Sequence, residues 1–93
     1  MANKTRLSPE EVRARVVSLT DWDLAGDAIR RRYKFASFKE SIAFVNRVAE
    51  LAERADHHPD ILIEYDKVTL TLSSHDAGGL TERDFALARS IDA

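Results

Sequence analysis

The feature that most constrains the fold is an uninterrupted stretch from Phe38 to about Ala55 that contains neither glycine nor proline and is rich in Ala, Glu, Leu and Arg. These residue types favour helix, and the stretch is long enough for about four to five turns. Pro59 disfavours helical backbone at the residue before it, so we expect the helix to end at or just before His57 and His58. Its apolar positions cover a wider arc than contact with one sheet needs, which leaves surface for a partner.

Two shorter helices are indicated by N-terminal capping signals on either side of this stretch. Ser8 is followed by Pro9 and then by Glu11, the pattern of a capping box with proline in the first turn. Thr81 and Asp84 repeat the capping-box spacing near the end of the sequence. We therefore expect one helix to begin after Ser8 and a short final helix to begin after Thr81.

A β-hairpin is predicted between the first two helices, because residues 22–24 and 28–35 flank a turn signal at Gly26-Asp27. In the second strand, apolar and basic side chains take opposite parities, as in a strand with one face in water. The apolar set is Ile29, Tyr33 and Phe35, and the basic set is Arg30, Arg32 and Lys34. The basic set is expected to be a solvated face, with binding of an acidic partner as the alternative. Arg31 breaks the pattern and leaves the register open.

A second hairpin is predicted from residues 61–65 and 68–74, joined by Asp66 and Lys67. Residues 68–74 contain no glycine, proline or charge, so we expect an unprotected edge strand through which two copies pair. The order helix, hairpin, helix, hairpin, helix predicts an α+β fold with three helices on one face of a four-stranded antiparallel sheet. One domain is expected over residues 1–93, because no linker or repeat divides the chain.

Composition argues against several classes of function. The 14 basic and 16 acidic residues give a net charge of −2, which disfavours a nucleic-acid or membrane-surface protein. The absence of cysteine removes disulfides, iron–sulfur clusters, thiolate zinc sites and cysteine nucleophiles. No apolar run is long enough for a signal core or a membrane span, so we expect a cytoplasmic protein. A chain of 93 residues has little interior, which favours self-association.

All three histidines lie between positions 57 and 75, and they form the cluster best suited to exchange protons near neutral pH. Glu53 lies four positions before His57, a spacing that would let its carboxylate orient the imidazole. His75 falls on the polar parity of its strand, and a bend at Gly78-Gly79 would fold Asp84 back towards it. We therefore expect these side chains to converge on one pocket.

Each of these residues also has a purely structural interpretation. Adjacent histidines at a helix end are often solvated residues that suit the helix dipole, and residue types alone favour that interpretation. Asp84 is fully explained by a capping box with Thr81. Tyr65 is expected to pack in the core. A zinc site is disfavoured, because the histidines include no helical pair four positions apart.

The spacing of residues 53 to 84 resembles the signature of the pterin-4a-carbinolamine dehydratase family. That signature is an acid or similar residue, then His-His-Pro, an aromatic residue, a histidine and an aspartate, at set intervals. In this chain it reads Glu53, His57-His58-Pro59, Tyr65, His75 and Asp84. The surrounding residues and the element order also look like the family, so the resemblance covers nearly the whole chain.

The resemblance implies removal of water from 4a-hydroxytetrahydropterin to give quinonoid dihydropterin, in the recycling of the tetrahydrobiopterin that aromatic amino acid hydroxylases use. By matching position, His57 would be the leading acid or base, His75 would act on the other side of the ring, and His58 would mainly bind substrate. Glu53 would orient His57, and Asp84 would bind or orient near His75. Further substrate-binding or orienting positions are Asp56, Pro59, Ser73 and Ser74.

The resemblance also implies no cofactor and no metal, and assembly into homodimers or homotetramers. The family includes members that act by binding proteins, namely a dimerisation cofactor of a homeodomain transcription factor and a Rubisco assembly factor, so a non-catalytic binding module is the alternative. In one departure, many members carry tryptophan two residues after the proline, where this chain has Ile61. The lost stacking would weaken pterin binding by about 1–3 kcal/mol.

Overall fold

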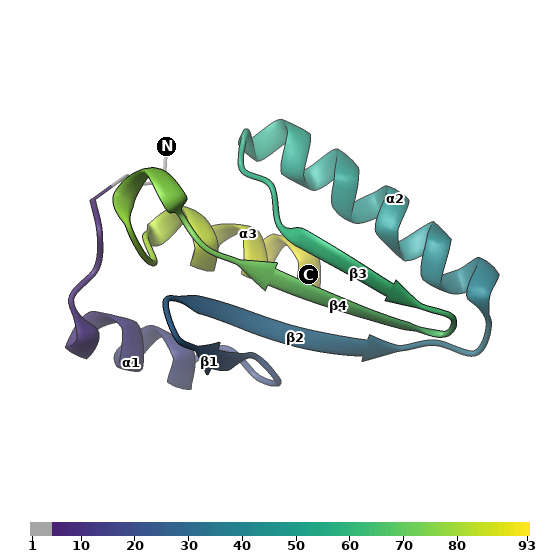
Figure 1. Ribbon diagram of the computed structural model, residues 1–93, viewed down its shortest axis with the longest axis horizontal. Helices are drawn as coiled ribbons and strands as arrows, with labels where there is room; N and C mark the ends of the chain where they lie inside the picture. The colour runs from purple at the N-terminus through teal and green to yellow at the C-terminus, as the bar shows by residue number, and fades with distance from the viewer. Residues whose placement is uncertain (1–4) are drawn as a thin grey trace.

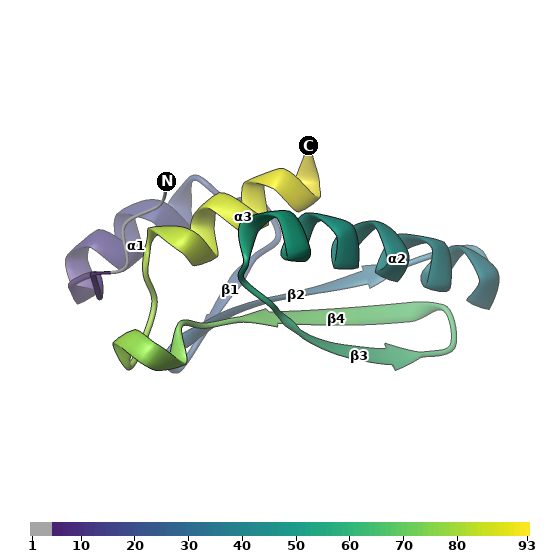
Figure 2. The same cartoon turned by 90° about the horizontal axis from the view of Figure 1, so that it is seen from above.

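The computed structural model describes residues 5–93, so the predicted domain start at Met1 lies outside the described residues. The elements are α1 (Pro9–Val17), β1 (Asp23–Ala25), β2 (Ala28–Lys34), α2 (Phe38–Ala55), β3 (Asp60–Glu64), β4 (Lys67–Leu72), the 3-10 helix η1 (His75–Ala77) and α3 (Glu82–Asp92). The four strands form one antiparallel sheet in the order β1-β2-β4-β3 (Figure 1). The three α-helices lie over one face of this sheet (Figure 2), which confirms the predicted α+β architecture.

Both predicted capping boxes are present. Ser8 Oγ accepts a hydrogen bond from Glu11 N at 3.2 Å, and the Glu11 carboxylate accepts one from Ser8 N at 2.9 Å. Thr81 and Asp84 form the corresponding pair at the start of α3. The central helix ends at Asp56, whose φ of 50° lies in the left-handed region, so it stops just before the two adjacent histidines as predicted.

Arg31, the residue that left the register of β2 open, lies on the helix-covered face of the sheet. Its Nη1 is 3.1 Å from Asp92 Oδ2, and its guanidinium carbon lies 4.4 Å from the centre of the Tyr33 ring. Trp22 Nε1 and Tyr33 OH each donate to the same carboxylate at 2.6 Å. The alternation of side chains along β2 is therefore regular through Arg31, and the carboxylate of Asp92 on α3 balances the charge of Arg31 on the covered face. Arg30, Arg32 and Lys34 are exposed on the other face of the strand, which confirms the predicted solvated basic face.

β4 is a central strand, and the prediction that it forms an unprotected edge is wrong. It pairs with β2 on one side and with β3 on the other. Its lack of charge reflects burial instead, since Val68, Leu70 and Leu72 are fully buried. The exposed edge next to it is β3, where every residue is exposed, including Leu62 at 55%.

The β3–β4 turn lies one residue earlier than predicted. Glu64 pairs with Lys67, so the turn consists of Tyr65, with a φ of 56°, and Asp66. Asp66 accepts hydrogen bonds from Lys67 and Lys34 at 3.0 and 3.1 Å, and these bonds lower the pKa of Asp66. Tyr65 is 67% exposed at this turn, so the expectation that it packs in the core is wrong.

The core lies between the helix layer and the covered face of β2 and β4. Its buried members from α2, β4 and α3 are Val48, Ala52, Val68, Leu70, Leu72, Phe85, Leu87, Ala88 and Ile91. Phe44 of α2 adds an aromatic contact with Tyr33 and Phe35, with ring centres 4.5 and 5.0 Å away. Part of the wide apolar arc of α2 is thus used inside the molecule, and its use by a partner stays a prediction.

Candidate active site

A cavity of about 410 Å³ lies at the C-terminal end of β4, on the side of the sheet away from α1, α2 and α3. Thr71 and Ser73 line it, and their strand parity is opposite to that of the buried Leu72. Its lining also includes His58, Asp60, His75 and Gly79. We call it the histidine cavity.

Two of the three histidines share this cavity. His58 comes from the segment between α2 and β3, and His75 is the first residue of η1. Both side chains are exposed, so both imidazoles can meet a ligand from solvent. His58 Nε2 is 2.5 Å from Glu53 Oε2, which ties this imidazole to the last turns of α2.

The predicted pairing of Glu53 with His57 is wrong, because the carboxylate meets His58 instead. The four-residue spacing would bring Glu53 and His57 together only if the helix continued through His57. The left-handed backbone of Asp56 ends the helix one residue too early for that contact. Beyond Asp56, the chain turns so that the next histidine reaches Glu53.

His57 points into the interior and belongs to a buried polar network. His57 Nε2 is 2.6 Å from Asp84 Oδ1, and the side chains are 9% and 0% exposed. The other carboxylate oxygen, Oδ2, accepts hydrogen bonds from Ser74 Oγ at 2.8 Å and from Thr81 N at 2.9 Å. Ser74 Oγ also lies 2.9 Å from Thr81 Oγ1. These four residues, called the Asp84 network below, join α2, β4 and α3.

The predicted single pocket is therefore divided into two parts. His57 does not line the histidine cavity, and it lines a separate cavity of about 490 Å³ between α2 and α3. Consecutive residues in extended backbone point to opposite sides, and Pro59 favours that backbone at His58. Asp84 forms hydrogen bonds with His57, Ser74 and Thr81, and Ser74 is the residue before His75, so its expected role of binding or orienting near His75 stays a prediction.

Of the other positions predicted to bind or orient substrate, some line the histidine cavity and others do not. Asp56 is the exposed C-terminal cap of α2, and Pro59 is half-buried before β3; neither lines the histidine cavity. Ser73 lines the cavity, and its Oγ donates to the Asp27 carbonyl at 3.0 Å. Ile61, at the position where the resemblance implies tryptophan, lies opposite Leu70 and does not line the cavity.

The sequence interpretation missed several residues of the site. Thr71 shares the parity of Ser73, so strand alternation alone could have indicated it. Asp60 lies opposite Thr71 in the β3–β4 hairpin. Asp27, in the β1–β2 turn, reaches the cavity lining through the pairing of β2 with β4, two strands distant in sequence, which no local pattern shows. Thr81 was recognised as a helix cap, yet its hydroxyl also belongs to the Asp84 network.

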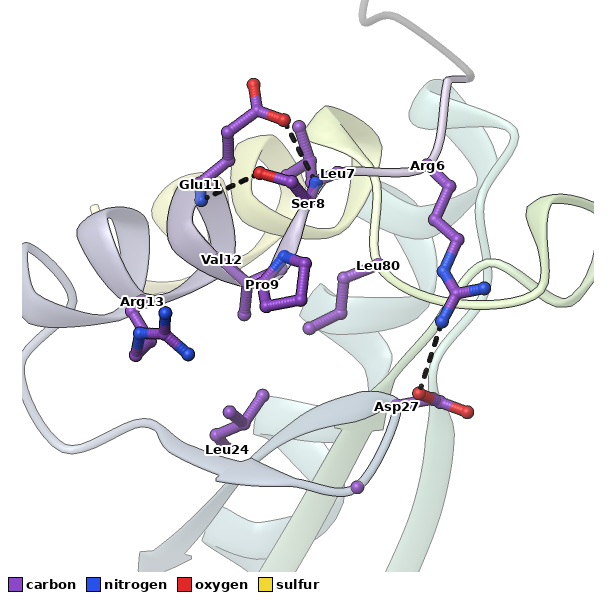
Figure 3. Close-up of a pocket in the computed structure, with 11 residues that line it drawn as sticks. Arg6, Leu7, Ser8, Pro9, Glu11, Val12, Arg13, Leu24, Asp27 and Leu80 are labelled. Atoms are coloured by element: carbon purple, nitrogen blue, oxygen red, sulfur yellow. Dashed lines mark hydrogen bonds and ion pairs between the residues drawn. The ribbon is translucent and has the colours of Figure 1, made fainter.

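A third cavity, of about 500 Å³, lies between the segment before α1, the first turn of α1 and the β1–β2 turn (Figure 3). Val12, Leu24 and Leu80 give it an apolar lining, and Arg6 at its edge reaches Asp27 at 3.8 Å. Asp27 also lines the histidine cavity, so the two cavities adjoin at this turn. None of the predicted site residues lines this third cavity.

Within residues 5–93, no group of three or more histidine, aspartate or glutamate side chains is placed to hold a metal ion. Over the same residues, no helix combines the length and the apolar character that crossing a bilayer requires.

The model of the family described as "Pterin 4 alpha carbinolamine dehydratase" matches residues 5–93. A protein of Picosynechococcus sp. named "Putative pterin-4-alpha-carbinolamine dehydratase" is 51% identical over 88 residues, which cover 95% of this chain and 96% of that protein. A protein of Nocardia farcinica with the same name is 55% identical over 86 residues, covering 92% and 90%.

Two solved structures are also similar. The crystal structure of a transcriptional coactivator/pterin dehydratase from Brucella melitensis superposes with a TM-score of 0.90 at 33% identity, covering 95% of this chain and 96% of that one. A pterin dehydratase-like protein identified as a RuBisCO assembly factor in the alpha-carboxysome gives a TM-score of 0.62 at 26% identity, covering 76% and 82%.

Proposed function

Because the chain belongs to the pterin-4-alpha-carbinolamine dehydratase family, we propose that it removes water from 4a-hydroxytetrahydropterin to give quinonoid dihydropterin. The observation that carries this proposal is the histidine cavity, which holds two solvent-accessible imidazoles, His58 and His75. The reaction would serve the recycling of tetrahydrobiopterin for aromatic amino acid hydroxylases in the cytoplasm.

The chemistry of the step suits these side chains. Expulsion of hydroxide from the tertiary carbon needs a proton donor at the leaving oxygen, and the neighbouring ring nitrogen must give up a proton. Imidazole is the side chain whose ordinary pKa lies closest to neutral pH, so it serves either role there. Two imidazoles from different segments of the chain would supply one acid and one base to a pterin bound between them.

The geometry favours His58 and His75 as the acid–base pair. Glu53 would orient His58 through their 2.5 Å contact. His57, which the resemblance places first, is engaged by Asp84 inside the molecule, so we assign it a positioning role: it holds the segment that carries His58. Ser73 and Thr71 supply hydroxyls at the cavity wall for the polar edge of the pterin.

The test is the rate of dehydration of freshly prepared 4a-hydroxytetrahydropterin, measured against the uncatalysed rate. We expect the wild-type protein to accelerate it, and His58→Ala and His75→Ala each to lower kcat by about 100-fold, the size of one general acid–base contribution. Ser90→Ala, on the helix side, is the matched control and should keep full activity. A wild-type protein that leaves the uncatalysed rate unchanged would refute the proposal.

A second candidate function is a protein-binding module without catalysis. It is favoured by two structural relatives, of which one is a RuBisCO assembly factor and the other a transcriptional coactivator/pterin dehydratase. The retained pair of exposed histidines argues for the enzyme instead. Co-purification of a stoichiometric partner with a wild-type protein that is inactive in the dehydration assay would support the second candidate.

We also propose that copies of the chain associate through β3. Among residues 5–93, no strand pairs with the outer backbone edge of β3, and β3 exposes Ile61, Leu62 and Ile63 at 37%, 55% and 37%. An apolar edge strand of this kind is a ready template for pairing with another chain. An antiparallel β3–β3 contact would continue the sheet from one copy into the next.

A further inference from the structure

The histidine cavity is lined by two carboxylates that differ in how they are engaged. Asp60 is the first residue of β3, and Asp27 lies in the β1–β2 turn. Asp27 Oδ1 lies 3.8 Å from Arg6 Nη2, and the Asp27 carbonyl accepts the hydrogen bond of Ser73. Within residues 5–93, the exposed carboxylate of Asp60 has no hydrogen bond or ion pair. Both of its oxygens are therefore open to a bound ligand.

The sheet register places the two carboxylates on opposite sides of β4. Asp60 of β3 lies directly opposite Thr71, so the two side chains point to the same face of the sheet. The β1–β2 turn, which holds Asp27, lies on the other side, because β2 is the other neighbour of β4. Thr71 and Ser73 of β4 line the cavity between them. The two carboxylates therefore mark opposite ends of the histidine cavity.

The cations near the cavity do not neutralise Asp60 in the described part of the chain. Arg30 lies beyond Thr71, two strands away from Asp60, and no ion pair joins the two side chains. His58 is engaged by Glu53, and Arg6 lies at the Asp27 end. The Asp60 end of the cavity is consequently suited to a ligand group that donates hydrogen bonds.

We propose that Asp60 binds the pyrimidine edge of the pterin, where it accepts hydrogen bonds from the ring N3–H and from the 2-amino group. The inference rests on the proposed function. These two donors lie side by side and parallel, like the two N–H groups that a guanidinium presents to a carboxylate, so each bonds one oxygen of Asp60. Asp60 thereby determines specificity for a 2-amino-4-oxopteridine over a 2,4-dioxopteridine, which has an oxygen in place of the amino group.

This contact also sets the direction of the ring in the cavity. The 2-amino group and the 6-side chain lie at opposite ends of a pterin, and the reacting carbon lies between them. With the amino end at Asp60, the reacting carbon falls over the middle of the cavity. The 6-side chain then points towards Asp27 and the adjoining third cavity.

The experiment measures binding, so it does not depend on turnover. The probes are 6-methylpterin and 6-methyllumazine, two oxidised, unreactive and fluorescent rings that differ in the group at position 2. The proteins are the wild type, Asp60→Asn, Asp27→Asn and the matched control Glu64→Gln. Glu64 is also an exposed acid of β3, but it does not line the histidine cavity.

We expect the wild type to bind 6-methylpterin about tenfold more tightly than 6-methyllumazine, because the dioxo ring sets an oxygen against the carboxylate. Asp60→Asn should reverse this preference, since an amide presents one acceptor to N3–H and one donor to the oxygen at position 2. A residue with a purely structural role would not reverse it. Asp27→Asn and the control should keep the wild-type preference.

Equal affinity of the wild type for the two probes, or an Asp60→Asn variant that keeps the wild-type preference, would overturn the inference. A preference reversed by Asp27→Asn instead would place the pyrimidine edge at the other end of the cavity and would overturn it too. In each case, acceleration of the dehydration reaction by the same wild-type preparation would leave the proposed function standing. A wild type that neither binds the probes nor accelerates dehydration would reject both.

Discussion

His57 and His58 are consecutive residues with opposite surroundings. One imidazole is buried against a carboxylate in the helix layer, and the other is exposed at a cavity on the far side of the sheet. Asp84 is fully buried, and its carboxylate reaches an imidazole, a hydroxyl and a backbone N–H. A buried carboxylate is tolerated only when such partners replace its water, so removing it leaves several groups unsatisfied at once.

We therefore predict that Asp84→Ala lowers the free energy of unfolding by about 3 kcal/mol. Urea denaturation measures the change. Glu53→Ala is the matched control, because it also removes a carboxylate from a histidine but at a pair that is 57% and 75% exposed. The control should shift stability by less than about 1 kcal/mol. Equal losses in both variants would contradict the assigned difference in burial.

Tyr33 supplies a prediction about pH. Burial, together with the hydrogen bond to Asp92 and the charge of that carboxylate, raises the pKa of the Tyr33 phenol. Because the folded-state pKa is the higher one, the stability that this group contributes is fully present below the ordinary tyrosine pKa of about 10 and is lost as pH rises above it.

The difference in melting temperature between wild type and Tyr33→Phe should consequently shrink between about pH 8 and pH 11. Differential scanning calorimetry at both pH values gives this difference. Tyr65→Phe, at an exposed hydroxyl, should differ from wild type by the same small amount at both. A Tyr33→Phe difference that stays constant or grows over this range would contradict the assignment.

At the scale of elements, the last turn of α3 is held by side chains from three distant segments of the chain. Arg31 of β2 and Trp22 before β1 both reach the Asp92 carboxylate, as does Tyr33. Arg47 of α2 adds hydrogen bonds to the carbonyls of Ile91 and Ala93 at 3.0 and 2.9 Å. The end of this helix is thus fixed by polar contacts as well as by its apolar face.

Asp92→Ala should destabilise the protein by about 2 kcal/mol, because it leaves the indole N–H of the buried Trp22 and the hydroxyl of Tyr33 without this acceptor. Glu50→Ala, at an exposed position of α2, should stay within about 0.5 kcal/mol of wild type. Chemical denaturation followed by far-UV circular dichroism measures both. Equal stability of wild type and Asp92→Ala would show that the carboxylate contacts contribute nothing.

Local patterns in the sequence were enough to predict the helices, because caps and helix propensity act over a few residues. Ser8, Thr81 and the proline after the adjacent histidines each mark a boundary that the structure confirms. The order of strands was not accessible in this way. A charge-free strand is typical both of an exposed edge and of a buried centre, and only the placement of β4 between β2 and β3 decides between them.

The site was predicted as a set of residues but not as an arrangement. Glu53 was paired with the wrong histidine because one residue, Asp56, adopts a left-handed backbone that residue types do not specify. Asp84 was placed near the right strand end, yet its contacts depend on how α3 packs against α2. Both differences arise where the chain leaves regular secondary structure. At such positions the spacing of apolar residues does not predict the direction of a side chain.

At the scale of the whole molecule, association through β3 makes a sharp prediction. Leu62→Lys places a charge on the exposed edge strand and should lower the molar mass in solution to that of one chain, as measured by light scattering. Val17→Lys is the matched control, because Val17 is an exposed apolar residue (87%) on α1, away from β3. A mass that falls in both variants, or in neither, would reject this interface.

The separation of the helix layer from the helix-free face has a consequence for how such chains diversify. The residues that close the interior, including His57 and Asp84, lie on one side of the sheet, and the accessible imidazoles lie on the other. Mutations can therefore accumulate on the open side at little cost to folding. A descendant of such a chain could lose the catalytic histidines, keep a stable fold and gain a new function, such as binding other proteins during assembly.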